Sequence, residues 1–90
     1  MAKIVFPSQM NKLTLGESEI ELSANSLGMA FEQMARQFPA LGEALMDDHG
    51  NVAPFIKVFV GDVQVAQDEF STLVLGNDDT VTIIAAVAGG

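Results

Sequence analysis

Apolar and polar residues alternate in two short segments near the start of the chain, residues 3–6 and 18–23. Alternation is typical of a strand with one buried face, and Pro7 stops the first segment because proline cannot donate to a strand ladder. These segments predict two strands joined by a long loop, with Leu13 and Leu15 tucked under the sheet edge. The residues expected on the buried face are Ile4, Phe6, Ile20 and Leu22.

The next part of the chain has a helical period. Apolar residues recur at spacings of one and three between residues 27 and 38, and Asn25 or Ser26 provides a helix cap. Pro39 ends this helix because the residue before a proline disfavours the helical backbone. A short second helix over residues 40–46 is expected to follow.

The second half of the chain returns to segments that favour strands. After a turn over residues 47–51, residues 55–60 are rich in β-branched and aromatic side chains. Gly61-Asp62 then predicts a tight hairpin to a short strand over residues 63–65. The final strand is expected over residues 80–87.

The order is two strands, a helix, two strands and a closing strand. It is typical of an α+β fold in which one main helix packs on one face of a mixed sheet. The chain has 90 residues, of which 49% are hydrophobic, so it is long and apolar enough for one domain with one core. We expect the domain to cover residues 1–87 and residues 88–90 to form a flexible tail.

Acidic residues outnumber basic residues by 12 to 4, which gives a formal net charge of −8 at pH 7. Binding to nucleic acid or to an anionic membrane depends on Lys and Arg, so this composition disfavours both partners. A protein with a basic docking surface is attracted instead. The longest apolar run, residues 83–88, is too short to span a membrane, and no signal-peptide pattern opens the chain. A cytoplasmic location is therefore expected.

Side-chain chemistry is limited by what the composition lacks. The absence of cysteine excludes thiol nucleophiles, persulfide carriage on a side chain and thiolate metal sites. His49 is the single histidine, and neither Asp47-Asp48 nor Asp78-Asp79 has the ligand spacing of a calcium loop. We expect no catalytic side chain, no metal site and no bound cofactor.

The C-terminus is the most informative part of the sequence. Gly89 and Gly90 follow the final strand through Val87 and Ala88. Because glycine has no Cβ, such a tail is thin enough to enter a narrow channel, and its terminal carbonyl is unshielded on both sides. The alternative interpretation is a frayed end without a function.

The ending Asp-Thr-Val-Thr-Ile-Ile-Ala-Ala-Val-Ala-Gly-Gly, residues 79–90, resembles the C-terminus of the ubiquitin-like sulfur carrier proteins of molybdopterin, thiamin and cysteine biosynthesis. The resemblance implies the β-grasp fold of that family. The chain departs from the family at residues 77–79, where Asp-Gly-Asp is frequent, and at Ala85, where proline is frequent. The segments most similar to the cysteine-forming carriers are residues 26–28, 55–60 and 86–90.

The resemblance implies a protein cosubstrate and not an enzyme. In this family an E1-like adenylating enzyme uses ATP to activate the terminal carboxylate, here that of Gly90, and a sulfur donor then replaces the adenylate. The product is a thiocarboxylate, a soft anionic nucleophile that delivers sulfur in the synthesis of cysteine, methionine, a cofactor or a siderophore. Gly89, Ala88 and Val87 are then the residues of the tail that the enzymes recognise.

The implied partners are the E1-like enzyme, a sulfur-accepting synthase and a metalloprotease that processes the C-terminus. A carrier that docks with two enzymes in turn is expected to be a monomer when free. Two other functions stay open at this point. One is a ubiquitin-like modifier that is joined to lysines of other proteins through Gly90, and the other is a β-grasp binding module whose terminal glycines are incidental.

A docking surface is expected on one face of the sheet. If the last strand buries Val81 and Ile83, Ile84 points to the opposite face. Phe59 points the same way if Val58 is buried. Exposed Phe59 and Ile84 on neighbouring strands predict an interaction patch. The alternative is that the two side chains are isolated, or covered by irregular segments.

Overall fold

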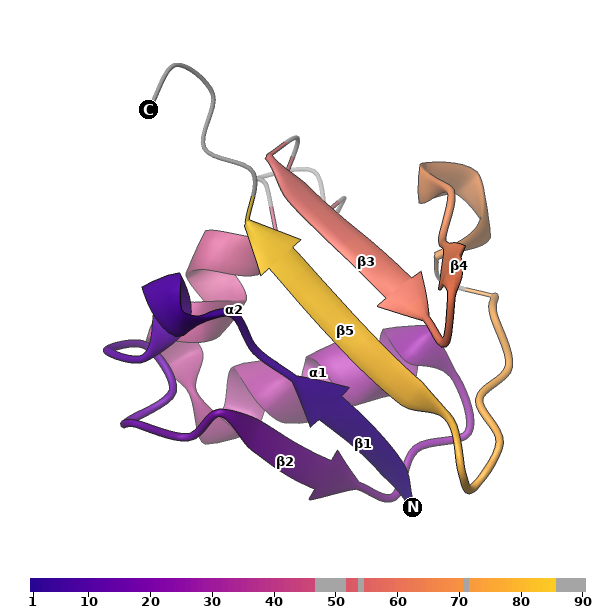
Figure 1. Cartoon of the computed structure of the whole chain (residues 1–90), viewed down its shortest axis with the longest axis horizontal. Helices are drawn as coiled ribbons and strands as arrows, with labels where there is room; N and C mark the ends of the chain where they lie inside the picture. The colour runs from indigo at the N-terminus through magenta and orange to yellow at the C-terminus, as the bar shows by residue number, and fades with distance from the viewer. Residues whose placement is uncertain (47–51, 54, 71, 86–90) are drawn as a thin grey trace.

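The computed structural model describes residues 1–46, 52–53, 55–70 and 72–85 (Figure 1). Within them, each strand and helix expected from the sequence is present, and its described ends differ from expectation by at most one residue. The expected turn over residues 47–51 and the end of the last strand, residues 86–87, lie outside the described residues. The strands are β1 (Ala2–Val5), β2 (Glu19–Leu22), β3 (Ile56–Val60), β4 (Val63–Gln64) and β5 (Thr80–Ala85), and the helices are α1 (Leu27–Gln37), α2 (Pro39–Leu45) and the 3-10 turns η1 (Ser8–Met10) and η2 (Gln67–Glu69).

The strands form one mixed sheet in the order β2-β1-β5-β3-β4. The two hairpins, β1–β2 and β3–β4, are antiparallel, and β5 lies between them (Figure 1). It runs parallel to β1 and antiparallel to β3. The last strand of the chain is therefore held from both sides in the centre of the sheet.

Helix α1 begins and ends where the sequence indicates. The Ser26 side chain accepts a hydrogen bond from the Met29 backbone N–H at 3.2 Å, which satisfies one free donor of the first turn. Phe38 ends α1, and Pro39 is the first residue of α2. Proline is well suited to that position because its fixed φ matches the helix and its missing N–H would have no partner there.

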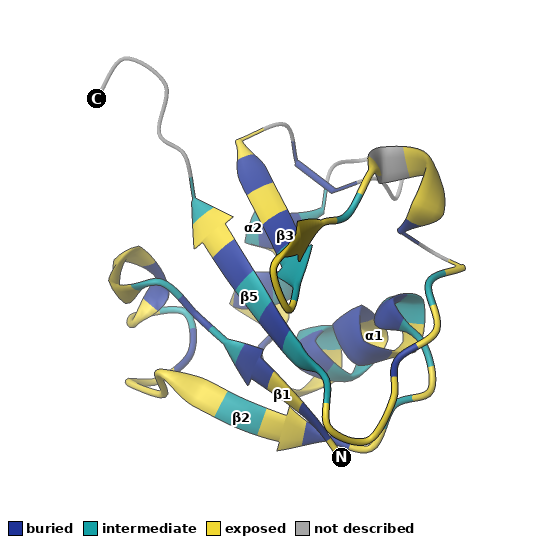
Figure 2. Ribbon diagram, turned by 45° about the vertical axis from the view of Figure 1, so that its right-hand side comes forward, coloured by how far each residue is buried: buried dark blue, intermediate teal, exposed yellow. Residues whose placement is uncertain are grey.

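The core lies between the sheet and the two helices, which cover the same face of the sheet (Figures 1 and 2). Two edge-to-face ring pairs join its layers, Phe6 with Phe38 and Phe31 with Phe70, with centroids 6.4 and 4.6 Å apart. Residues from all parts of the described chain contribute. The largest apolar side chains with almost no exposure are Ile4, Leu22, Leu27, Met34, Leu41, Leu45, Val81 and Ile83.

The two helices approach each other closely at Gly42 of α2. A Cβ added to Gly42 would lie 2.7 Å from the Cβ of Ala35 in α1 and 3.1 Å from its Cα. Such distances are shorter than packed carbon atoms allow, so only glycine fits here without a shift of the helices. This contact brings α2 against α1 and completes the cover over the sheet.

The loop between β1 and β2 differs from expectation in one residue. Leu13 packs against the core as expected, but Leu15 is 82% exposed, so the predicted burial of Leu15 is wrong. The buried side chain in this part of the loop is that of Thr14, whose hydroxyl donates to the Glu17 carbonyl at 2.7 Å. Leu15 follows with a φ of 55°, and this left-handed conformation accompanies the outward position of its side chain.

Candidate functional site

The site is built around the end of β5. Ala85 is the last described residue of this strand, and it pairs with Ile56 at the start of β3. Val87, Ala88, Gly89 and Gly90, the residues singled out by the sequence, lie outside the described residues. They follow a strand that is paired with β1 up to Thr82 and with β3 up to its last described residue, Ala85 (Figure 1).

Side chains alternate along β5 as the sequence predicts. Val81 and Ile83 are 0% and 1% exposed on the face that the helices cover. Thr82 and Ile84 point to the opposite face, where Ile84 is 42% exposed. The ribbon of β5 accordingly carries alternating bands of burial (Figure 2). Alternation follows from strand geometry, and the helices on one face decide which set is buried.

The register brings Ile84 next to other apolar atoms on that open face. Phe59, which is half-buried, pairs with Thr82 in the β3–β5 ladder, and Thr82 pairs with Val5 on its other side. Phe59 and Ile84 are therefore diagonal neighbours on one face, close enough for an aromatic side chain to bridge. We call Val5, Phe59, Thr82 and Ile84 the outer-face patch.

Sequence reasoning identified Phe59 and Ile84 but did not identify Val5 as part of this surface. The β-prone pattern of residues 3–6 shows that Val5 lies opposite Ile4. It carries no signal for the parallel pairing of β1 with β5 that puts Val5 beside Thr82. That pairing joins strands about 75 residues apart, and only the tertiary structure reveals it.

Charged residues border the outer-face patch on both sides. Lys57 pairs with Ile84 and is exposed, and among the described residues after Leu45 it is the single lysine or arginine. On the β2 side, Glu19 pairs with Val5, and its carboxylate lies 3.6 Å from the Lys3 ammonium. Both side chains of this ion pair are about half exposed, so it contributes little to stability. The patch is uncharged, with apolar side chains around Thr82, and it has charged residues at its rim.

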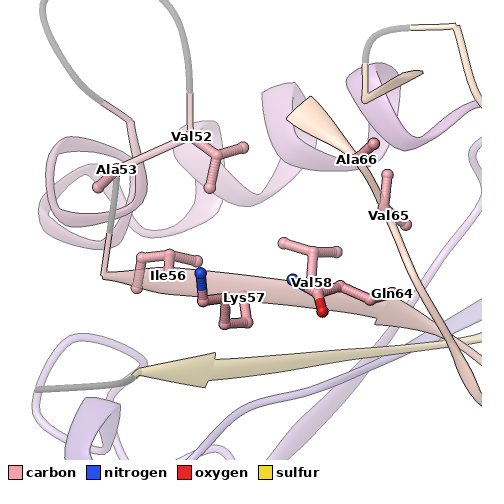
Figure 3. Close-up of a pocket in the computed structure, with 8 residues that line it drawn as sticks. All are labelled: Val52, Ala53, Ile56, Lys57, Val58, Gln64, Val65 and Ala66. Atoms are coloured by element: carbon pink, nitrogen blue, oxygen red, sulfur yellow. The ribbon is translucent and has the colours of Figure 1, made fainter. Parts of the chain in front are cut away.

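A shallow hollow of about 170 Å³ follows the free edge of β3, because β4 is only two residues long (Figure 3). Two backbone hydrogen bonds lie along it, from Ile56 to Ala53 at 3.0 Å and from Val65 to Val58 at 2.8 Å. Lys57 is the one ionisable side chain among its lining residues, so the hollow brings no acid–base pair together. The lining residues are Val52, Ala53, Ile56, Lys57, Val58, Gln64, Val65 and Ala66.

The described part of the chain holds no group of three or more metal-binding side chains. Its helices, likewise within the described ranges, include none that is long and apolar enough to cross a membrane. What the described residues do present at the end of β5 is a partly apolar sheet face. Of the site residues predicted from the sequence, the structure brings Phe59 and Ile84 together on one face.

Comparisons with known proteins give a consistent result. No protein-family profile matches the chain. The sulfur carrier protein CysO of Mycobacterium tuberculosis is 27% identical over 89 residues, which cover 97% of this chain and 96% of that protein. The crystal structure of M. tuberculosis CysO matches with a TM-score of 0.86 and 24% identity, over 97% of this chain and 100% of the other.

A second solved structure, the BexX/CysO complex of Amycolatopsis orientalis, contains a chain that matches with a TM-score of 0.83 and 25% identity. That match covers 100% of both chains. The mixed sheet with its helices on one face is thus the β-grasp fold of these proteins, as the sequence predicted.

Proposed function

From the homology of this chain to the CysO sulfur carrier proteins, we propose that it is a sulfur carrier whose Gly90 carboxylate is converted to a thiocarboxylate. The observation that supports this most strongly is the coincidence of a match over 97% of the chain with a Gly-Gly end that begins four residues after Ala85 of the central strand. The protein then acts as a cosubstrate of other enzymes. The sulfur is carried by the main-chain terminus and not by a side chain.

The proposed reaction proceeds in two steps on the terminal carboxylate. A carboxylate oxygen attacks the α-phosphorus of ATP held by an adenylating enzyme, pyrophosphate leaves, and an acyl adenylate forms. A sulfide equivalent from a sulfur donor then attacks the carbonyl carbon, the carbon–oxygen bond breaks, and AMP leaves with the bonding electron pair. The sulfur of the resulting thiocarboxylate then attacks an electrophile on the sulfur-accepting enzyme. Water hydrolyses the bond between the carbonyl carbon and the sulfur, which leaves the sulfur on the acceptor and returns the carboxylate.

The fold supports this role because the sheet holds β5, whereas the terminal carboxylate is carried by the residues that follow it in the chain. β5 is paired with β1 up to Thr82 and with β3 up to Ala85, so a partner that binds the sheet is given a fixed starting point for the residues that follow. The side-chain-poor residues Gly89 and Gly90 allow close approach of an enzyme to the terminal carbonyl. The absence of cysteine means that no internal thiol competes for the activated terminus.

The outer-face patch is the proposed docking surface for the enzymes. Ile84 is six residues before Gly90, and Phe59 is its diagonal neighbour, so a protein bound here lies beside the tail. CysO of A. orientalis is found in a complex with BexX, which supports a role in which a partner protein is bound. The net charge of −8 favours partners with basic surfaces, and we place the protein in the cytoplasm with them.

Intact-mass measurement tests the proposal directly. The full-length protein is incubated with ATP, sulfide and its cognate adenylating enzyme, whose activity is verified by ATP-dependent pyrophosphate release. We expect the mass change for replacement of one oxygen by sulfur, located at Gly90 by fragmentation. Reactions without ATP, or without sulfide, serve as controls, and we expect no species with the mass of the thiocarboxylate in either.

The same measurement separates the other two functions. Adducts that join Gly90 to lysines of other proteins would identify a modifier, because both functions begin with the same adenylate. An unchanged mass with a verified active enzyme would contradict the carrier and the modifier alike. It would leave a binding module of the β-grasp fold as the remaining interpretation.

A further inference from the structure

A second apolar hollow lies on the helix side of the sheet, between β4 and the segment that follows η2. Its volume is about 260 Å³, and its walls are mostly aliphatic. We call it the β4 groove. Its lining residues are Val60, Val63, Gln64, Val65, Glu69, Leu73 and Val74.

Two valines of the β4 groove are unusually exposed. Val63 is 69% exposed and Val74 is 77% exposed, whereas Val60, Val65 and Leu73 are partly buried and pack against the core. Val63 pairs with Val60 in the β3–β4 hairpin, and Val74 makes an isolated bridge to Ser26 at the start of α1. The fold thus holds two exposed valines from separate segments around one hollow, which is typical of an interaction site.

The charged residues that line the β4 groove, or that are next to its lining residues in the chain, are acidic, and Lys57 lies in the adjoining hollow, which shares Gln64 and Val65 with the groove. Glu69 lines it, and Asp62 and Asp68 are exposed residues directly beside Val63 and Glu69 in the chain. From Val58 to the C-terminus the sequence contains no lysine or arginine. The acidic residues of this stretch are Asp62, Asp68, Glu69, Asp78 and Asp79.

The β4 groove is separate from the described end of β5 and from the outer-face patch. The Gly61 N–H donates to the Thr80 carbonyl at 2.9 Å, so the β3–β4 hairpin lies at the start of β5, whereas the tail follows its end. In Figure 1, β3 lies between β5 and β4. Val63 and Val60 also face the helix side, opposite to Phe59.

We propose that the β4 groove is a second docking surface that binds an aliphatic or aromatic segment of a partner protein flanked by lysine or arginine. The apolar walls accept the apolar side chains, and the acidic residues attract the flanking cations. Because the groove is remote from the described end of β5, a protein bound there leaves the C-terminus and the outer-face patch accessible. The protein can then be held by one partner while its tail is in the active site of another.

A peptide titration followed by NMR tests this surface in the full-length chain. The probe is the peptide acetyl-Lys-Lys-Leu-Phe-Leu-Lys-Lys-amide. Two comparison peptides replace every lysine by glutamate or every apolar residue by serine. We expect saturable shifts of the amide signals of Val63, Val65, Leu73 and Val74 with the first peptide alone, and weaker binding as salt is raised.

Matched variants locate the binding. The double change Val63→Ser and Val74→Ser should raise the dissociation constant by about fivefold or more, because it removes the exposed apolar contacts. Ile84→Ser, on the outer-face patch, and deletion of Gly90 should leave the dissociation constant unchanged. None of the three variants replaces a residue of the buried core, and the amide spectrum of each variant reports whether its fold is preserved.

Any of four results would overturn the proposal of a second docking surface, and three of them concern where and how the peptide binds. They are shifts centred on Phe59 and Ile84, equal binding of the glutamate peptide, and binding that the Val63→Ser, Val74→Ser variant leaves unaltered. A lack of any saturable shift would overturn it as well. None of these results bears on thiocarboxylate formation at Gly90, so the two proposals fail or succeed separately.

Discussion

The two faces of β5 place adjacent isoleucines in opposite environments. Ile83 is 1% exposed beneath the helices, whereas Ile84 is 42% exposed on the uncovered face, one residue nearer to the tail. The chemistry of the two side chains is the same, so the difference arises from what covers the sheet. It teaches that alternate positions of one strand serve the core and the open face, and we expect that stability and the proposed partner recognition can be changed separately.

The largest expected effect comes from the tail, which follows both sets of side chains in the chain. Deletion of Gly90 should abolish sulfur transfer, because the carboxylate is then carried by Gly89 and lies one residue short of the enzyme's reacting atoms. The midpoint of thermal unfolding should change by less than about 2 °C, since a chain end beyond the last paired residue adds little to the core. Transfer is measured with the adenylating enzyme by intact mass.

Deletion of Met1, a residue that is 62% exposed at the other terminus, is the matched control and should retain transfer. Retained transfer after deletion of Gly90 would contradict a role for that carboxylate. A fall of the unfolding midpoint by more than a few degrees would contradict the separation of the tail from the folded part.

The comparison of Ile83→Ala with Ile84→Ala tests the two faces directly. Ile83→Ala should lower the free energy of unfolding by about 2–5 kcal/mol, because it removes buried methyl groups and leaves a cavity. Ile84→Ala should lower it by less than about 1 kcal/mol, because its side chain is already partly in water. Urea unfolding followed by circular dichroism measures both. Equal losses would break the contrast between the faces.

The helix layer over the covered face is tested at Gly42. Gly42→Ala should lower the free energy of unfolding by about 1–3 kcal/mol, because the new Cβ would lie 2.7 Å from the Cβ of Ala35. The higher intrinsic helix preference of alanine over glycine would by itself raise the free energy of unfolding by about 1 kcal/mol. The sign of the measured change in that free energy therefore decides between the two effects. Thermal or urea unfolding gives that sign.

The second change Ala35→Gly provides the control for this contact. In the double variant the two Cβ atoms no longer meet, so its loss of stability should be smaller than the sum of the two single losses. Strict additivity would mean that Gly42 and Ala35 do not constrain each other.

The smallest expected effect concerns recognition on the open face. Ile84→Asp should reduce the rate of carboxylate activation at low carrier concentration by about tenfold, corresponding to about 1.4 kcal/mol of lost binding. The rate with saturating carrier and the free energy of unfolding should change much less. Thr80→Asp places the same charge on the same face at the other end of β5, and it should retain activation. Equal effects of the two variants would point to net charge instead of docking.

Much of the fold could be predicted from the sequence because its signals are local. The cap at Ser26, the stop at Pro39 and the alternation of Val81 and Ile83 with Ile84 were each visible in a few neighbouring residues, and all are confirmed. Leu15 shows where local reasoning is insufficient. Its apolar side chain suggested burial, but the left-handed backbone beside buried Thr14 accompanies its exposure to solvent.

The sequence by itself determined the order of strands and helices, the faces of each element and the Gly-Gly end. Periodicity, capping and proline act over a few residues, and these features depend on nothing more distant. The tertiary structure alone decided that Val5 lies beside Thr82 and that Val63 and Val74 border one groove. Those contacts join segments that are distant in the chain, and their positions follow from how the sheet and the helices pack together.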